Sequence, residues 1–185
     1  AEQGFDKSQY NLGILYSKNK NMEAAKKWYE KAAKQEHLDA MNNLGIVYQK
    51  NGEIKTAIKW YEEAIKKGNT IAIYNLGLLH DEEGKKEEAK KWYEKAISLG
   101  DTSAMNRLGL MYDKEGNLDE AKKWYMRSAR LENTLAMNNL GTVYENEGNL
   151  EEAKKWYERA ANLGEAIAMS NLGNLYKEKG NVKEA

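Results

Sequence analysis

The chain lacks cysteine and proline altogether, and among its 185 residues it holds only two histidines and one phenylalanine. The absence of cysteine excludes disulfides and thiolate metal sites, and it leaves the compartment open because reducing and oxidising environments both tolerate it. The absence of proline means that nothing forces a break inside a helix. No apolar run approaches the roughly 20 residues that a membrane-spanning helix needs, and no signal-peptide pattern stands at the start. We therefore expect a soluble chain without a membrane partner, with the cytoplasm favoured slightly over export from a bacterium.

Neither sign of charge prevails in the chain. It has 29 basic and 29 acidic residues, so no global field steers it toward nucleic acid or an anionic membrane. Charged residues make up 31% of the chain and are interleaved, which is typical of solvated helix faces and not of a disordered tail.

What the chain does have is a 32-residue unit repeated almost six times. A Trp-Tyr pair marks the unit at Trp28-Tyr29, Trp60-Tyr61, Trp92-Tyr93, Trp124-Tyr125 and Trp156-Tyr157. A Leu-Gly pair marks it at Leu12-Gly13, Leu44-Gly45, Leu76-Gly77, Leu108-Gly109, Leu140-Gly141 and Leu172-Gly173. A fixed period of this length predicts a solenoid in which each unit buries its apolar face against its neighbours. We divide residues 1–185, as one array, into units 1–32, 33–64, 65–96, 97–128, 129–160 and a partial unit 161–185.

Each unit is predicted to be a helix hairpin, which residues 129–160 illustrate. Apolar residues at the i, i+3, i+4 spacing predict a first helix that ends before Gly148, where a left-handed residue is needed. Asn149 and Glu152 predict a capping box for a second helix that ends near Gly164. The residues equivalent to Gly148 are Gly52, Gly84, Gly116 and Gly180. The pairs equivalent to Asn149/Glu152 are Asn117/Glu120 and Asn181/Glu184, and the residues equivalent to Gly164 are Gly68 and Gly100. Thr70, Thr102 and Thr134 are the predicted N-caps of the next first helices.

Small and aromatic residues predict how the helices pack. Glycine inside a helix costs about 1 kcal/mol relative to alanine, so Gly13 and its equivalents are expected to let a neighbouring helix approach closely. The five Trp and most of the 12 Tyr are expected to fill the remaining interior. We expect the first helices on the inner side of the array and the second helices on the outer side.

The pattern resembles a known family. The residues that carry the likeness are Ala136-x3-Leu140-Gly141-x2-Tyr144, Gly148, Ala153-x2-Trp156-Tyr157-x2-Ala160-Ala161 and Gly164. This pattern resembles the Sel-one-like branch of the tetratricopeptide superfamily over the whole chain. The resemblance implies an all-α fold, an alpha-alpha superhelix in which antiparallel helix hairpins form a right-handed solenoid. It also implies noncatalytic adaptor work, in which scaffolds hold extended peptides or partner proteins. Two features depart from the related patterns. The turn at Glu145–Asn149 is shorter than in the Sel-one-like pattern, and the period of 32 residues is shorter than the 34 residues of ordinary tetratricopeptide units.

A partner is expected on the face of each first helix that lies opposite the core. This predicted groove comprises Tyr10, Asn11, Ile14, Asn42, Asn43, Ile46, Tyr74, Asn75, Leu78, Asn106, Arg107, Leu110, Asn138, Asn139 and Asn171. An Asn amide both donates and accepts, so a strip of them beside apolar residues suits an extended peptide backbone. In the alternative interpretation, the amides bond to the adjacent helix or to water. Arg107 either anchors an anionic group of the ligand or pairs with Asp113 or Glu115.

Other signals favour structural roles. Four lysine pairs have an acidic residue four positions before the second lysine, which predicts i, i+4 ion pairs and disfavours nucleic acid as a partner. They are Glu23 with Lys26-Lys27, Glu87 with Lys90-Lys91, Asp119 with Lys122-Lys123, and Glu151 with Lys154-Lys155. His37 and His80 occupy unrelated slots, and His80 is interpreted as a core substitution for Tyr. No catalytic constellation, metal-ligand cluster or cofactor motif is present, so we expect neither an enzyme nor a bound cofactor or metal.

Two alternatives to a peptide-binding scaffold stay open. The chain starts and stops in mid-repeat, which suggests a piece of a longer array. Leu172, Leu175 and Tyr176 would then be uncovered, favouring a spacer that associates weakly head to tail through its cut ends. An engineered consensus array is a further alternative, although drift at slots such as Ile14 and Thr142 favours a natural sequence.

Overall fold

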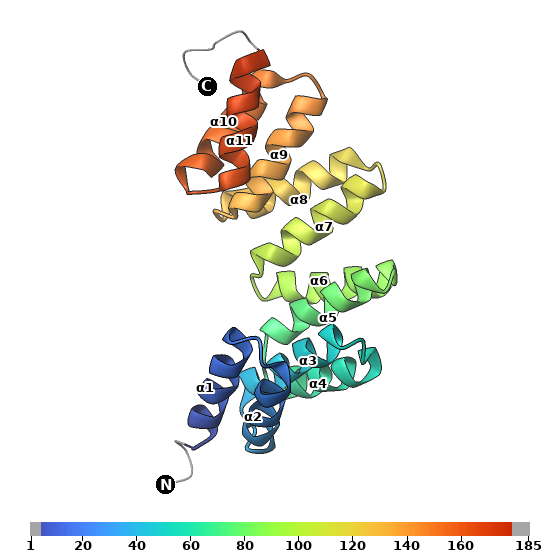
Figure 1. The fold of residues 1–185 in the computed structure, drawn as a ribbon. Helices are drawn as coiled ribbons and strands as arrows, with labels where there is room; N and C mark the ends of the chain where they lie inside the picture. The colour runs from blue at the N-terminus through green and yellow to red at the C-terminus, as the bar shows by residue number, and fades with distance from the viewer. Residues whose placement is uncertain (1–4, 179–185) are drawn as a thin grey trace. The chain divides into compact units, whose positions relative to one another are not determined.

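A computed structural model describes residues 5–178, and within that range every regular element is a helix (Figure 1). The chain divides into two compact units, Ala1–Leu99 and Gly100–Ala185, which are described separately. The first unit contains α1 (Phe5–Lys18), α2 (Met22–Lys34), α3 (Leu38–Lys50), α4 (Ile54–Lys66), α5 (Ile71–Glu82) and α6 (Lys86–Ser98). The second contains α7 (Thr102–Lys114), α8 (Leu118–Arg130), α9 (Thr134–Asn146), α10 (Leu150–Asn162) and α11 (Ala166–Glu178).

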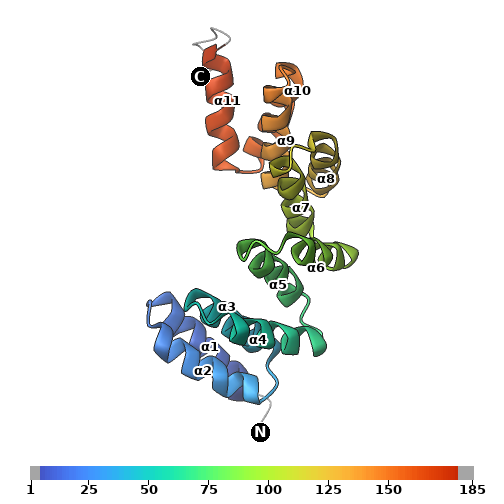
Figure 2. The same cartoon turned by 90° about the vertical axis from the view of Figure 1, so that its right-hand side faces the viewer.

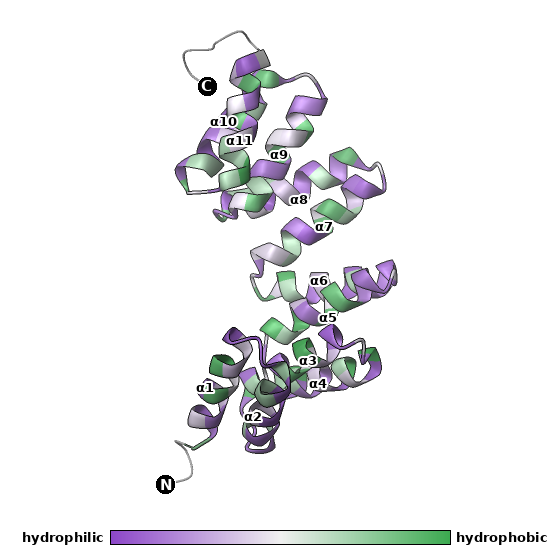
Figure 3. Cartoon of the chain, in the orientation of Figure 1, coloured by the Kyte–Doolittle hydropathy of each residue, from purple (hydrophilic) through white to green (hydrophobic). Residues whose placement is uncertain are grey.

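Every odd-numbered helix up to α9 packs on the even-numbered helix that follows it, which confirms the predicted hairpins (Figure 2). In the first unit α2 also packs on α3 and α4 on α5, while in the second unit α8 packs on α9 and α10 on α11. Hydrophobic residues recur at intervals along each helix among hydrophilic ones (Figure 3). This spacing gives each helix an apolar stripe to bury against its neighbours.

The predicted glycine turns are confirmed. Gly148 follows α9 with φ +77° and Gly164 follows α10 with φ +90°, in the left-handed region that a residue with a Cβ rarely adopts. The equivalent glycines Gly52, Gly68, Gly84, Gly100 and Gly116 do the same. At three turns a residue with a side chain takes this conformation instead, namely Lys20, Glu36 and Glu132. Gly180 lies outside the described residues.

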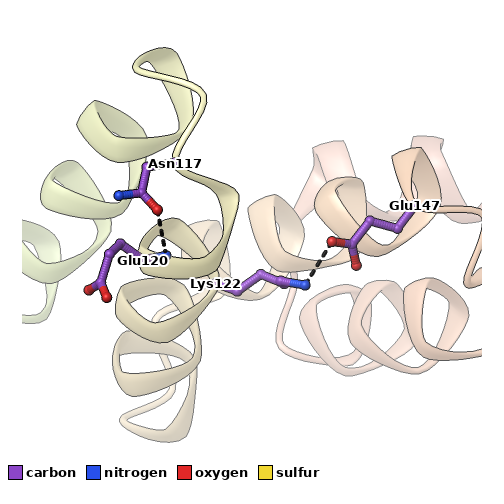
Figure 4. A network of polar contacts seen from close by, with 4 residues as sticks. All are labelled: Asn117, Glu120, Lys122 and Glu147. Carbon is purple, nitrogen blue, oxygen red and sulfur yellow. Dashed lines mark hydrogen bonds and ion pairs between the residues drawn. The ribbon is translucent and has the colours of Figure 1, made fainter.

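Only half of each predicted capping box forms. Asn117 Oδ1 accepts the backbone N–H of Glu120 at 3.3 Å, as predicted (Figure 4). The Glu120 carboxylate does not return to the backbone of Asn117, because it accepts from Lys123 Nζ while the Asn117 N–H donates to Tyr112 O. Asn149 and Glu152 repeat the same arrangement with Lys155. The pair Asn181/Glu184 lies outside the described residues.

The predicted threonine caps are wrong, because the capping side chain stands one residue earlier. Asp101 and Asn133 have extended backbone (φ −71°, ψ 109° for Asp101), and each accepts the N–H three residues on at 2.9 Å. Asn69 caps in the same way, because Thr70 already has helical angles. His37 fills this slot before α3, where its Nδ1 accepts the Ala40 N–H at 3.3 Å. This histidine therefore has a local structural role.

Tyrosine fills the interior of each hairpin. Tyr61, Tyr93, Tyr125 and Tyr157 are fully buried. A Cβ placed on Gly141 would lie 2.6 Å from Tyr157 Cε1, so the helix-interior glycines make room for a tyrosine ring of the paired helix. The five Trp are only partly buried, which corrects the prediction that they fill the interior. Cations lie over several of their rings, as Lys31 Nζ does at 4.0 Å from the Trp28 centroid.

Candidate functional site

The predicted groove residues lie on the odd-numbered helices, but they do not form one exposed strip. Asn42, Asn106 and Asn138 are buried, with 5–7% of their surface exposed, which corrects the expectation that they face solvent. The other members of the set are partly exposed, and Asn11 is exposed. The periodicity argument missed this because the buried Asn slot faces the next odd-numbered helix of the array.

The buried asparagines are bonded to asparagines of the next repeat. Asn75 Nδ2 donates to Asn42 Oδ1 at 2.8 Å in the first unit. In the second unit, Asn139 Nδ2 donates to Asn106 Oδ1 at 2.9 Å, and Asn171 Nδ2 donates to Asn138 Oδ1 at 3.0 Å. The two asparagines of each pair lie 33 positions apart in the sequence. The pairs link α3 to α5, α7 to α9 and α9 to α11, and together they form an asparagine ladder. This is the structural role that the alternative interpretation foresaw.

The outer partner of each pair still has capacity for a ligand. An Asn amide carries two N–H donors and two acceptor lone pairs, and the pair uses one donor. Asn75, Asn139 and Asn171 are partly exposed, and each has further donor and acceptor capacity on a side chain that is already held in place. In α3 the equivalent residue, Asn43, interacts with the hydroxyls of both Tyr10 and Tyr29, and Tyr10 takes the place of the buried asparagine in α1. The pairs thus fix the orientation of the exposed amides.

The residues beside the ladder differ between the two units. In the first unit Ile14, Ile46 and Leu78 are partly exposed beside the outer asparagines. In the second unit the same slot holds Leu110, then Thr142 and Asn174. Thr142 donates to Asn138 O at 3.2 Å, so the polar side chain is engaged within its own helix. The face is therefore apolar along the first unit and polar along most of the second.

Sequence reasoning missed a hollow at the N-terminal ends of α3 and α5. Its volume is about 460 Å³, and its polar lining includes Asp6 of α1 together with Glu36, Asp39 and Asn69. Asn69 Nδ2 donates to Asp39 Oδ1 at 3.0 Å, which ties the two helix ends together. The acidic residues at these helix starts were the available signal, but only the fold brings them to one hollow. Arg107 of α7 is partly buried and interacts with other residues of the chain.

Adjacent repeats are joined by a Lys-Glu-Tyr group. Tyr48 donates its hydroxyl to Glu30 Oε1 at 3.1 Å, while Lys26 Nζ lies 4.2 Å from its ring centroid. Tyr176, Glu158 and Lys154 repeat the group in the second unit. The face predicted to be uncovered on α11 is therefore covered by α10. Tyr176 and Leu172 are partly buried there, and Leu175 is fully buried.

His80 is the exception at this joint. It occupies the slot of Tyr48, and Ile58 occupies that of Lys26. His80 Nδ1 is buried, and it has no hydrogen-bond partner among residues 5–178. Burial lowers the pKa of His80 below its ordinary value and the charge of Lys85 acts in the same direction, whereas Glu88, Glu62 and Glu83 oppose them.

His80→Tyr, which restores the residue of the equivalent slots, is expected to make the chain less sensitive to acid. The unfolded chain takes up a proton at His80 near pH 6.5, but the folded chain does so only at a lower pH. The stability of the wild type is therefore full above that value and falls as the pH drops through it toward the folded pKa. Urea unfolding at pH 7.5 and pH 5.5 measures the loss in both proteins. An equal loss in the two would contradict this role, because the rest of the chain is the same in both proteins.

The ion pairs on the even-numbered helices differ from those predicted. Lys123 and Lys155 pair with Glu120 and Glu152 at 2.5 and 2.6 Å, three positions back and not four. Lys122 reaches across to Glu147 of the next hairpin at 2.7 Å (Figure 4). This bond draws one lysine of the pair away from its own helix. Among residues 5–178 no group of His, Cys, Asp or Glu has a metal-binding arrangement, and no helix is long and apolar enough to cross a membrane.

Comparison with protein families decides the relationship. A tetratricopeptide-repeat model matches residues 6–36, 71–99, 102–135 and 134–163, and a second one matches residues 37–69. The chain belongs to the tetratricopeptide-repeat family. No curated protein matches it. Repeats of this family are generally protein-interaction scaffolds and are typically noncatalytic.

Solved structures support the Sel1-like variant of this tetratricopeptide-repeat fold. A Sel1 repeat protein from Oxalobacter formigenes is 29% identical, with a TM-score of 0.73 over 92% of this chain and 78% of that one. The protective antigen c5321 of uropathogenic Escherichia coli, which has an SLR fold, is 25% identical, with a TM-score of 0.74 over 94% of this chain and 42% of that one. PilF of Pseudomonas aeruginosa shares the fold at 21% identity, with a TM-score of 0.78 over 98% and 89%.

Proposed function

We propose that this tetratricopeptide-repeat chain is a noncatalytic scaffold that binds an extended peptide segment of a partner protein on its odd-numbered helices. The observation that carries the proposal is the partly exposed amide of each outer asparagine, held in place by its buried partner, beside a row of aliphatic side chains. In the first unit this surface comprises Asn43, Asn75, Ile46 and Leu78. A peptide backbone offers the alternating donors and acceptors that such amides bind, and its side chains can contact the aliphatic row.

The asparagines both pair with one another and, in this proposal, bind the ligand, so a mutation of an asparagine affects stability as well as binding. Asn75→Ala would also leave the buried Asn42 Oδ1 without its partner, at a cost of about 1–3 kcal/mol. A loss of binding in that variant would therefore mix a structural defect with a lost ligand contact. The aliphatic row is a better target, because Thr142 shows that the same slot accepts threonine in α9.

The test selects binders from a random 10-residue peptide library on the full chain and measures the affinity of the selected peptides. The double variant Ile46→Thr/Leu78→Thr is expected to weaken binding at least tenfold, because each aliphatic side chain buried by a ligand contributes about 1.5 kcal/mol. Leu99→Thr is the matched control, since Leu99 is exposed at the end of α6, away from this face. N-methylation of the peptide backbone is expected to weaken binding as well. Binding of the double variant within twofold of the wild type would refute the proposal.

A second candidate function, head-to-tail association of copies, has its own observation. Leu15 of α1 is 53% exposed, although its equivalent in α3, Val47, is buried. Met169 of α11 is 50% exposed, although its equivalent in α9, Met137, is buried. Stacking of α11 of one copy on α1 of another would cover both side chains. Light scattering over a range of concentrations tests this, and a strictly monomeric profile rejects it.

A further inference from the structure

A hollow on an even-numbered helix recurs in both units. In the first unit it lies on α2, has a volume of about 380 Å³ and is lined by Tyr16, Ala24, Lys27, Trp28, Glu30, Lys31 and Lys34. In the second unit a hollow of about 390 Å³ is lined by Lys155, Glu158, Arg159 and Asn162 of α10, together with Glu132 and Leu163. The four α10 residues stand four 32-residue periods after Lys27, Glu30, Lys31 and Lys34. The hollow is therefore a product of the repeat and not of one irregular turn.

The two hollows share a cation held against a tryptophan ring. Lys31 Nζ lies 4.0 Å from the centroid of Trp28, and Arg159 Cζ lies 5.7 Å from that of Trp156. The ring attracts the cation and limits its movement, which lowers the entropy that a ligand must remove on binding. Each hollow thus has a positioned positive charge, and in the α2 hollow Trp28 itself forms part of the lining.

The α2 hollow has the larger excess of positive charge. Lys27, Lys31 and Lys34 are exposed at the i, i+4, i+7 positions of one helix face. Among residues 5–178, none of the salt bridges involves these three lysines. The one carboxylate that lines the hollow belongs to Glu30, and its Oε1 is occupied by the Tyr48 hydroxyl of the next hairpin. Three cations therefore face a single carboxylate that already has a partner.

The same three slots in the other even-numbered helices show what is particular to α2. They hold Lys59, Glu63 and Lys66 in α4; Lys91, Lys95 and Ser98 in α6; Lys123, Arg127 and Arg130 in α8; Lys155, Arg159 and Asn162 in α10. Only α8 also has three basic residues, and there Lys123 is paired with Glu120 at 2.5 Å. Within the described chain, α2 thus combines three basic residues at these slots with no salt bridge to any of them.

We propose that the α2 hollow binds a short acidic peptide segment of a partner protein. Lys27 and Lys34 are seven residues apart, which corresponds to about 10 Å along a helix. An extended segment of about four residues has the same length, so its carboxylates can meet the three lysines while an apolar side chain packs on Trp28. The surface belongs to an even-numbered helix, so this proposal is independent of the face proposed on the odd-numbered helices.

A peptide fits this surface better than a polyanion does. Glu23 of α2 and Glu36 in the turn that follows α2 flank the lysines, and both are exposed, although Glu36 also pairs with Lys67 at 2.6 Å. A nucleic acid presents a charge at every nucleotide and would meet these carboxylates as well as the lysines. A four-residue acidic segment is short enough to contact the lysines alone.

The test uses the full chain and a fluorescein-labelled peptide, Gly-Glu-Leu-Glu-Glu-Gly, with fluorescence anisotropy at low and moderate salt. We expect saturable binding that weakens with salt and is lost when the three Glu of the peptide are replaced by Gln. Lys31→Glu is expected to weaken binding at least tenfold, and the fold accommodates it because α4 has Glu63 at the same slot. Lys34→Ser, which copies Ser98 of α6, is expected to weaken binding by a smaller factor and serves as the second variant should Lys31→Glu fold poorly.

The control Lys59→Glu makes the same change of net charge on α4 and is expected to leave binding within twofold. The variant Ile46→Thr/Leu78→Thr should also leave it unchanged, which separates this site from the proposed peptide face. Equal weakening by Lys59→Glu, or unchanged binding in both α2 variants, would overturn the proposal. Tighter binding of a ten-nucleotide oligothymidylate than of the peptide would also overturn it, because the surface would then serve nucleic acid.

Discussion

Gly141→Ala is expected to lower the free energy of unfolding, although alanine is the better helix former. The added Cβ would lie 2.6 Å from Tyr157 Cε1, and the tyrosine ring is fully buried, so it has no free direction in which to move. Overpacking of this kind costs about 1–3 kcal/mol, and the gain in helix propensity offsets about 1 kcal/mol of it. A net loss of up to about 2 kcal/mol is expected in urea unfolding followed by circular dichroism.

Gly173→Ala is the matched control for this prediction. Gly173 occupies the same slot in α11, but within residues 5–178 no side chain or neighbouring helix lies within 4 Å of the position of its Cβ. The same substitution is therefore expected to stabilise α11 by about 0.5–1 kcal/mol through helix propensity. Opposite signs at the two sites would show that the tyrosine ring selects glycine. A gain in stability at both sites would show that the ring yields, and the steric explanation would be wrong.

The local features of the fold were predictable from the sequence. The period gives the hairpins, and Gly148 marks its turn because only a residue without a Cβ adopts φ +77° without strain. Asn149 marks a helix start because its amide oxygen accepts a backbone N–H within three residues. These features depend on the chain within a few residues, and an array of repeats displays the same local solution many times.

Features that depend on the rotation of a helix about its axis were not predictable. Trp156 and Tyr157 are neighbours in sequence and differ by only 100° around the helix, so periodicity could not decide which one enters the interior. The capping prediction failed by one residue for a related reason. Thr134 and Asn133 can both cap a helix, and the backbone angles of the turn select Asn133.

The sequence predicted which residues of the candidate site share a helix face, but not which of them are buried or which residues they contact. The helical period groups Asn138 and Asn139 on one face, yet Asn138 is buried and Asn139 is partly exposed. Their separate roles follow from the sideways spacing of successive odd-numbered helices, which brings Asn139 onto Asn106 and Asn171 onto Asn138. That spacing is set by packing between repeats. The sequence of a single repeat does not determine this packing.

Tyr157→Ala is expected to be among the most destabilising substitutions in the chain, and more costly than Trp156→Ala. Tyr157 is fully buried, so its removal leaves a cavity and costs about 3–5 kcal/mol, as for other large aromatic residues. Trp156 is larger but only partly buried, so its loss is expected to cost about 1–3 kcal/mol. Urea unfolding of both variants decides the order. A larger loss for Trp156→Ala would mean that the Trp slot carries the packing.

Tyr157→Phe separates the hydroxyl of Tyr157 from its ring. The hydroxyl donates to Glu145 Oε2 at 2.6 Å and lies 3.1 Å from Thr142 Oγ1. A hydrogen bond to a charged group contributes about 1.5–3 kcal/mol, so the phenylalanine variant is expected to fall between the wild type and Tyr157→Ala. The double variant Gly141→Ala/Tyr157→Ala then tests the coupling, because the cavity left by the ring can take the new methyl group. Its stability should be at least that of Tyr157→Ala alone, and a simple sum of the two losses would show that the glycine and the tyrosine are not packed as one unit.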